Sequence, residues 1–205
     1  MSTLIEIDPE MVRRYVYSLA EYGRVGESGV TRLVYSPEWV AATDQYAAWC
    51  EEGGLDVRRD VVGNVWGILK GTEDGKSIVS GSHIDSQAPG GRYDGALGTL
   101  SAMIALKVLK AQFGQPKRTL EAVALCEEES SRFPSANYWG SRAITGRIGS
   151  DIPDKTIAFT GETMSEAMRA IGLDPARILE ARRDDIDSFI EVHIEQGPVL
   201  EAADQ

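Results

Sequence analysis

The sequence predicts an α/β fold in which a mostly parallel sheet is flanked by helices. Short apolar segments of strand length alternate along the chain with segments whose apolar residues recur at helical spacing. Several of the strand-like segments run into loops rich in glycine and proline, which end them. Buried strands that alternate with helices form sheets covered on both faces. With 205 residues, of which 42% are hydrophobic, the chain is long enough to bury one substantial core.

Capping signals predict the first two helices. Asp8 can cap a helix over residues 9–22, and Ser36 can cap a second helix over residues 37–52. Each helix would begin with proline, which is favoured at the first helical position. A pair of glycines follows the second helix, where helices commonly end.

The middle of the chain is predicted to contain a hairpin, a central strand and a long helix. The hairpin comprises strands 55–62 and 64–69, joined by a turn that contains glycine. The apolar residues Ile78 and Val79 indicate a short buried strand. Residues 97–113 then show apolar side chains at helical spacing, so the unit runs from strand through glycine-rich loop to helix.

The rest of the chain is predicted to add two strands and two helices. The strands cover residues 118–126 and 188–193, and the helices cover residues 163–171 and 174–179. Each strand is apolar and ends in a polar segment. The strands therefore all present polar side chains at the same relative place, just beyond the strand end.

The charge balance excludes some classes of partner. The formal net charge is −11, which argues against binding to nucleic acid or to an anionic membrane. The N-terminus lacks the apolar core of a signal peptide, and no run approaches the roughly 18 apolar residues of a membrane span. Cys50 and Cys126 lie in unrelated apolar contexts and indicate reduced core thiols. The composition therefore predicts a cytoplasmic protein.

Three strand ends carry residue types that bind metals. The chain has only two histidines, His83 and His193, and both follow apolar strands. Asp94 lies across the glycine-rich loop from His83, and three consecutive glutamates, 127–129, follow the strand between the histidines. Imidazole and carboxylate ligands without cysteine suit zinc, and also manganese, cobalt or nickel. Asp85 could accept the second N–H of His83 and hold its ring in place.

A less specific interpretation exists for each of these features. Taken alone, His83 could belong to a solvated polar loop, and the glutamates could form a solvated charge run. The metal-site interpretation is favoured because three separate strands each deliver ligand-type residues at the same relative place.

Three segments together resemble the hydantoinase/carbamoylase branch of the M20 metallohydrolases. They are residues 81–98 (GSHIDSQAPGGRYDGALG), 127–146 (EEESSRFPSANYWGSRAITG) and 189–201 (FIEVHIEQGPVLE). Residues 31–39 (TRLVYSPEW) match as well, so the resemblance covers nearly the whole chain. This branch includes N-carbamoyl-L-amino acid hydrolases, allantoate amidohydrolases and beta-ureidopropionases.

The resemblance implies two divalent metal ions, most simply zinc, with manganese, cobalt or nickel as alternatives. Asp94 would bridge the two ions, and His83, Glu129 and His193 would complete the ligands. The resemblance leaves open which ligand belongs to which metal.

The resemblance also implies a general base, Glu128, which would take a proton from the metal-bound water. The register of the glutamates could slip by one, and Glu128 with Glu129 is preferred because the family's pair is last in its acidic run. Gln196 resembles a family residue near the substrate and is a weak candidate for substrate binding. Ser130 departs from the family, which usually has glycine there, and it adds a β-carbon beside the expected metal ligand Glu129.

The implied function is hydrolysis of a linear carbamoyl or ureido amide in a small molecule such as an N-carbamoyl amino acid or allantoate. The alternatives are an M20-type metallopeptidase and a truncated, non-catalytic metal-binding fragment. The resembling enzymes are about twice this long. Residues 1–205 are therefore expected to be the N-terminal portion of the catalytic domain, without the lid and dimerisation domain and without a final metal-binding histidine. The full-length protein would be a homodimer, and the fragment alone would be inactive.

Overall fold

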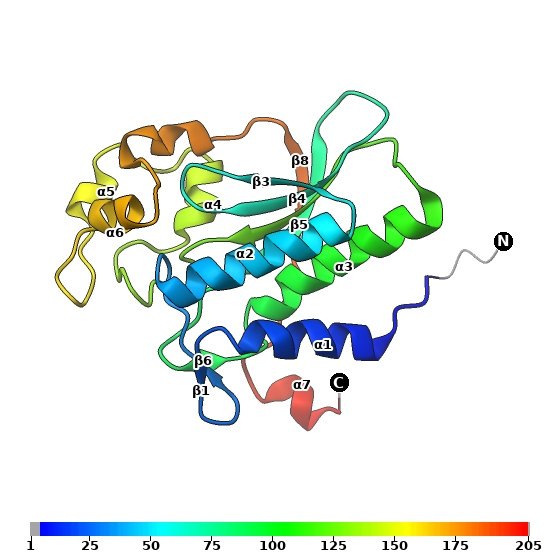
Figure 1. Cartoon of the computed structure of the whole chain (residues 1–205), viewed down its shortest axis with the longest axis horizontal. Coiled ribbons are helices and arrows are strands. Elements are labelled where there is room, and N and C mark those ends of the chain that lie inside the picture. The colour runs from blue at the N-terminus through cyan, green and yellow to red at the C-terminus, as the bar shows by residue number, and fades with distance from the viewer. Residues whose placement is uncertain (1–4, 205) are drawn as a thin grey trace.

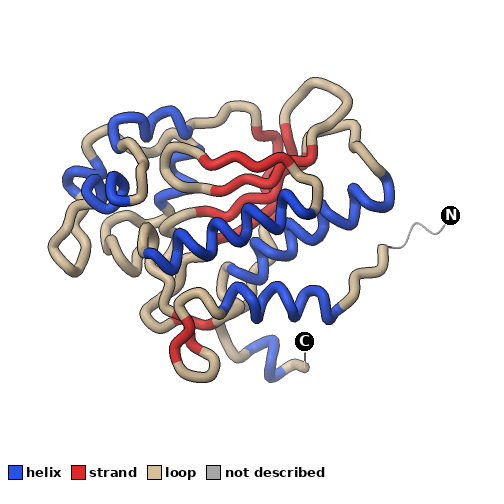
Figure 2. The backbone as a smooth tube through the Cα atoms, in the orientation of Figure 1, coloured by secondary structure: helices blue, strands red, loops and turns tan. Residues whose placement is uncertain are grey.

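A computed structural model describes residues 5–204, so residues 1–4 and 205 of the predicted domain lie outside the described part. The predicted α/β architecture is confirmed, with a sheet behind a layer of helices (Figures 1 and 2). The helices are α1 (Pro9–Ala20), α2 (Pro37–Glu52), α3 (Ala96–Phe113), α4 (Trp139–Ile144), α5 (Ile152–Lys155), α6 (Met164–Ala170), the 3-10 helix η1 (Pro175–Ala181) and α7 (Val199–Ala202). The strands are β1 (Arg24–Val25), β2 (Gly29–Val30), β3 (Asp56–Arg59), β4 (Val65–Leu69), β5 (Ser77–His83), β6 (Gly90–Gly91), β7 (Leu120–Leu125) and β8 (Ile186–Ile190).

The main sheet has five strands in the order β3-β4-β7-β5-β8. Strand β5 runs parallel to β7 and to β8, as expected, although β7 and not β5 is the middle strand of the sheet. The predicted hairpin is confirmed, because β3 is antiparallel to β4, as two strands joined by a short turn must be. Strand β4 is also antiparallel to β7, which the sequence did not predict. The sheet is therefore mixed, and a second small sheet has the order β1-β2-β6.

The predicted caps of the first two helices are confirmed. The side chain of Asp8 accepts a hydrogen bond from the Glu10 N–H at 3.0 Å, and α1 begins at Pro9. The Ser36 hydroxyl accepts one from the Trp39 N–H at 3.2 Å at the start of α2. These side chains satisfy N–H groups that have no partner inside the helix.

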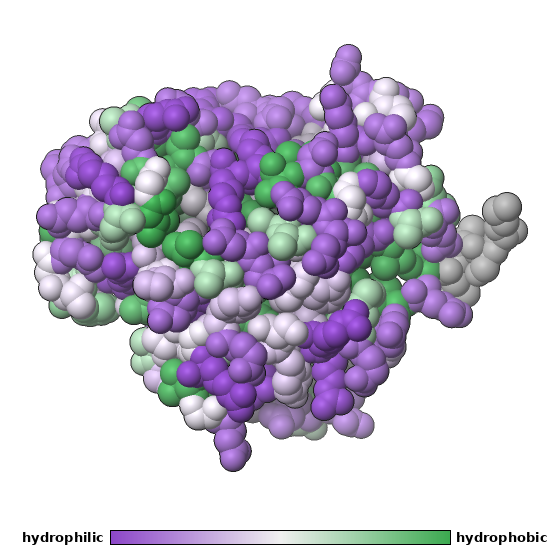
Figure 3. Space-filling view, viewed as in Figure 1, coloured by the Kyte–Doolittle hydropathy of each residue, from purple (hydrophilic) through white to green (hydrophobic). Residues whose placement is uncertain are grey.

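Helices α2 and α3 pack on one face of the main sheet, and α1 packs against these two helices (Figure 1). By length and composition alone α3 could cross a membrane, although the sequence has no continuous apolar run of roughly 18 residues. Its apolar residues have a different role here, because Leu100, Met103 and Ile104 are fully buried in the core. The outer surface of this helical face is mostly hydrophilic, with smaller hydrophobic patches (Figure 3).

The opposite face of the sheet is covered in part by α4. Ile144 of this short helix packs with Trp66, Val79, Val123 and Leu125 of the sheet in a separate apolar cluster. The two cysteines are free and buried, as the sequence predicts.

Two predictions near the C-terminus need correction. The helix expected over residues 174–179 is the 3-10 helix η1, and the last strand ends at Ile190 rather than at His193. Its pairing with β5 stops at Ser80 opposite Ile190. Beyond Ile190 the chain no longer pairs with β5, and Val192 lies against Gly98 in the first turn of α3.

A buried polar network joins the β3–β4 turn to β7. The Asn64 side-chain oxygen accepts a hydrogen bond from the Cys126 N–H at 2.9 Å, just where β7 ends. The Asn64 amide donates to a carboxylate oxygen of Asp60 at 2.8 Å, and the Trp66 indole N–H donates to the same oxygen at 3.2 Å. The network therefore fixes the end of β7, directly before the three glutamates 127–129.

We expect Asn64→Ala to lower the free energy of unfolding by about 1–3 kcal/mol, because it leaves the buried Cys126 N–H without a partner. Urea denaturation followed by circular dichroism measures this loss. Asn137→Ala is the matched control, because Asn137 is exposed and should change stability by less than about 0.5 kcal/mol. Equal losses in the two variants would contradict a structural role for the network.

Candidate functional site

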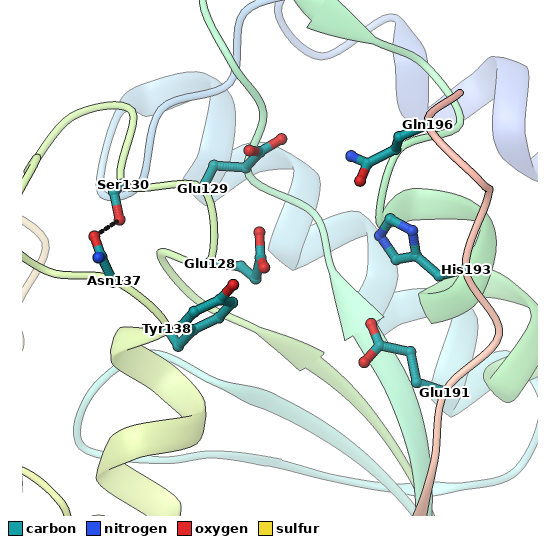
Figure 4. A pocket seen from close by; sticks show the side chains of 8 residues that line it. All are labelled: Glu128, Glu129, Ser130, Asn137, Tyr138, Glu191, His193 and Gln196. Atoms are coloured by element: carbon teal, nitrogen blue, oxygen red, sulfur yellow. Dashed lines mark hydrogen bonds between the residues drawn. The ribbon is translucent and has the colours of Figure 1, made fainter. Parts of the chain in front are cut away.

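A cavity of about 680 Å³ opens at the edge of the sheet where β5, β7 and β8 end. Parallel strands place their carboxyl ends together, and sites in α/β proteins are built there. Figure 4 shows two groups of side chains facing each other across this cavity. Its lining residues are Glu128, Glu129, Ser130, Asn137, Tyr138, Glu191, His193 and Gln196.

His83 is the last residue of β5, and its side chain is almost completely buried. Its Nδ1 lies 2.9 Å from the backbone carbonyl oxygen of Asp85, which can only accept a hydrogen bond. Nδ1 therefore carries the proton in this contact and leaves Nε2 available toward the cavity. Asp85 thus faces the histidine as expected, but through its carbonyl; its carboxylate lies farther away, with Oδ1 3.7 Å from Nδ1.

Asp94 reaches His83 because a glycine separates Asp94 from α3. The carboxylate Oδ1 of Asp94 lies 3.8 Å from Nε2 of His83. Gly95 has φ of +61°, and a Cβ atom there would lie 2.4 Å from the His83 ring. Only glycine combines this backbone conformation with so close an approach.

His193 completes a group of three potential ligands. Its Nε2 lies 3.4 Å from Oδ1 of Asp94, and its ring stacks on that of His83 with centroids 5.9 Å apart. The donor atoms of His83, Asp94 and His193 all lie within 4.8 Å of one another. The Gln196 amide donates hydrogen bonds of 2.7 Å to both oxygens of Asp94, so this residue also belongs to the site.

The glutamate run divides between the cavity and the interior. Glu127 is fully buried, and its Oε1 accepts a hydrogen bond from the Phe133 N–H at 2.9 Å. Burial, with the nearby charge of Asp85, raises the pKa of Glu127 to about 8. Glu128 and Glu129 line the cavity instead (Figure 4). The two glutamates that can reach a bound metal are therefore the last two of the run.

Both cavity glutamates lie near His83. Oε2 of Glu128 is 3.6 Å from Nε2 of His83, and His83, Glu128 and Glu129 form a second group of donor atoms within 4.8 Å. The Gln87 amide donates to Oε2 of Glu129 at 2.6 Å. Burial raises the pKa of both glutamates. Their interaction with His83 lowers it by less, so the pKa of each is raised overall. Burial lowers the pKa of His83, and the charges of Asp85 and Glu128 more than offset this, so that it is raised overall.

The backbone around the glutamates adopts conformations that favour glycine. Glu127, Ser130 and Tyr138 have φ of +47°, +55° and +55°. Such left-handed conformations cost energy in residues with a side chain, and they concentrate at functional sites. Ser130 therefore keeps the glycine-like turn despite its β-carbon, and its hydroxyl is 2.6 Å from Oδ1 of Asn137.

The residues present fit a divalent cation. Among the described residues that line the cavity, three are glutamates and none is lysine or arginine. One buried oxygen, Oε1 of Glu129, has no hydrogen-bond partner within the described part of the chain. Two imidazoles and several carboxylates without cysteine are a donor set for zinc, and they also fit manganese, cobalt or nickel.

Sequence reasoning missed Asn137 and Tyr138, which line the cavity, and also Gln87 and Glu191. Gln87 holds Glu129, and nothing in its sequence context indicates that contact. Glu191 lines the cavity two residues before His193. Because alternate residues of an extended chain face the same side, this spacing could have revealed it.

Comparison with known proteins supports the resemblance found in the sequence. Residues 79–205 match the family described as Peptidase family M20/M25/M40. The chain is 47% identical to the allantoate amidohydrolase of Bacillus subtilis (strain 168), over 91% of this chain and 45% of that protein. It is 36% identical to the N-carbamoyl-L-amino-acid amidohydrolase of Paenarthrobacter aurescens, over 97% of this chain and 48% of that protein.

A solved structure shows the same fold. The hydantoinase/carbamoylase family amidase from Burkholderia ambifaria superimposes with a TM-score of 0.89 at 32% sequence identity, over 98% of this chain and 49% of that one. The chain spans about half the length of the curated relatives it matches. The family match leads to one conclusion: the chain belongs to the M20 family of metallohydrolases, and its sequence and fold are similar to those of hydantoinase/carbamoylase enzymes.

Proposed function

We propose that this chain contributes the metal-binding site of an amidohydrolase that cleaves a linear carbamoyl or ureido amide. The observation that carries the proposal is the convergence of His83, Asp94 and His193 with Glu128 and Glu129 at one acidic cavity. The substrate class rests on the relatives, which are named for allantoate and for N-carbamoyl-L-amino acids. The proposed substrate is therefore a small molecule of one of these two kinds.

Two divalent ions would be held at this site. His83, Asp94 and His193 would hold one ion, since their donor atoms already lie together. Asp94 would be shared with the second ion, which Glu129 would also hold. When bound, the ions polarise the substrate carbonyl and lower the pKa of the attacking water.

Glu128 would act as the general base. Its carboxylate lines the cavity, with Oε2 3.6 Å from Nε2 of His83, and from this position it could accept a proton from a water molecule in the cavity. Burial shifts its pKa upward, toward the range that suits a base near neutral pH. Glu128 would take a proton from water and pass it to the nitrogen that leaves the cleaved amide.

Gln196 would contact the substrate beside the metals. Its amide is already aimed at Asp94, and an amide can donate to a carbonyl oxygen as well as accept from an N–H group. A homodimeric full-length protein and a cytoplasmic location stay predictions from the sequence.

In a protein that contains this chain and turns over its substrate, Glu128→Gln should retain bound metal and lose activity about 10²- to 10⁴-fold, because it abolishes proton transfer but not coordination. Metal analysis and kcat measured on the same sample test this. Glu129→Gln is the matched variant, and it should lose metal as well as activity. If Glu128→Gln lost the metal and Glu129→Gln retained it, Glu129 would be the general base and Glu128 the metal ligand.

The 205-residue chain by itself should bind one metal tightly and release no ammonia from allantoate or from an N-carbamoyl amino acid. In the proposed arrangement His83, Asp94 and His193 hold one ion. Only Asp94 and Glu129 would hold the other, and two carboxylates hold zinc poorly. Metal analysis after dialysis and an ammonia assay measure both outcomes. Turnover by pure chain with two metals bound would contradict the ligand assignment.

Gly95→Ala should weaken zinc binding about 10-fold or more, because the new Cβ would overlap the His83 ring and the φ of +61° disfavours alanine. Competition with a chromogenic chelator measures the affinity. Gly91→Ala in the same loop is the control, since no atom lies within 4 Å of a Cβ built there. Equal affinity in both variants would show that His83 does not bind the metal.

A further inference from the structure

His193 lies beside Asp94, although no strand pairing holds its chain segment. Strand β8 ends at Ile190, and residues 191–196 belong to no helix or strand. Most of this segment is exposed. Even so, Nε2 of His193 lies 3.4 Å from Oδ1 of Asp94. A metal ligand must be held by its surroundings if it is to bind tightly, so contacts other than strand pairing have to position this segment.

One such contact is a hydrogen bond between strand β5, which ends at His83, and the segment that leads to His193. The hydroxyl of Ser82 donates to Oε1 of Glu191 at 2.6 Å. Ser82 is completely buried and directly precedes His83 on β5. Glu191 lies two residues before His193. The hydrogen bond therefore ties the segment of one histidine to the rigid strand of the other.

A second contact comes from the first turn of α3. A Cβ atom built on Gly98 would lie 2.2 Å from the backbone oxygen of Val192 and 2.9 Å from Cβ of Ser82. The missing side chain allows the segment to lie directly on the helix, beside Ser82. Ser82 thus holds Glu191, and Gly98 lets Val192 lie against the core. These are the two residues that directly precede His193.

We infer that Ser82, Gly98 and Glu191 form a latch that positions His193 as a metal ligand. The inference rests on the proposed metal site. Glu191 is a positioning residue in this arrangement, because one oxygen of its carboxylate is held by Ser82 and it acts through His193. Its contribution is the accepted hydrogen bond rather than its negative charge, and this distinction makes the inference testable.

The test is zinc affinity of the 205-residue chain, measured by competition with a chelator, together with the absorption spectrum of the cobalt form. Ser82→Ala and Glu191→Ala should each weaken binding about 10- to 100-fold, the usual effect of losing a group that orients a ligand. The double variant should be no weaker than either single variant, since both remove one shared interaction. Glu191→Gln keeps an oxygen that can accept from Ser82, and it should bind zinc nearly as well as the unmodified chain.

Glu195→Ala is the matched control for charge. Glu195 lies two residues beyond His193 in the same exposed segment, and its carboxylate accepts from the Leu200 N–H at 2.9 Å instead of holding the histidine. This variant removes the same charge and should leave zinc affinity unchanged. Gly98→Ala gives an independent variant that should weaken binding by displacing the backbone of Val192. Thermal unfolding of each variant shows whether the fold is retained, and Glu191→Ala is expected to retain it because Glu191 is exposed.

The outcomes separate this inference from the proposed function. Equal weakening by Glu191→Gln and Glu191→Ala would show that the charge or direct coordination matters, and would overturn the latch. Additive losses in the double variant would overturn it as well. An unmodified chain that binds no zinc would overturn the proposed function itself, and the latch with it. Zinc binding that is unaffected by all latch variants would overturn the latch alone.

Discussion

The parallel pairing of β5 with β7 and β8 is the constraint on which the site depends. It aligns His83 with Leu125 at the end of β7, and Ser80 with Ile190 at the end of β8. Every chain segment that leaves these three strands therefore starts from the same edge of the sheet. Ligands that are far apart in the sequence become neighbours because hydrogen-bonded parallel strands fix their relative positions.

Holding the carboxylates together is the main energetic difficulty at this edge. Four acidic side chains surround the cavity or face it, and the described lining contains no lysine or arginine. Like charges in a partly buried site repel one another and shift their pKa values upward. A divalent cation relieves this repulsion, so the fold and the metal are complementary: the sheet brings the carboxylates together, and the ion would make that arrangement favourable.

Local backbone geometry supplies the precision that the sheet alone does not. Gly95 allows the His83 ring to approach the start of α3, and the Asn64 side chain fixes the end of β7. The left-handed residues Glu127 and Ser130 then turn the chain so that one glutamate enters the core and the next two face the cavity. Residues held in costly conformations persist only where their surroundings enforce them.

Much of this arrangement could be predicted because it depends on local signals. The proline and cap residues Asp8 and Ser36 predict where α1 and α2 begin, since a helix end needs partners for its free N–H groups. The convergence of His83, Asp94 and His193 could be predicted as well, because strand ends in an α/β sheet share one edge and the motifs resemble one family.

What the sequence by itself determined is therefore the set of elements and the kind of chemistry at their ends. The tertiary structure decided that β4 pairs antiparallel with β7, where β8 stops, and which of three identical glutamates turns inward. It also decided that Ser82 and Gly98 hold the segment of His193. These features depend on contacts between residues that are distant in the chain. Such contacts can outweigh local preferences, and no local sequence pattern indicates them.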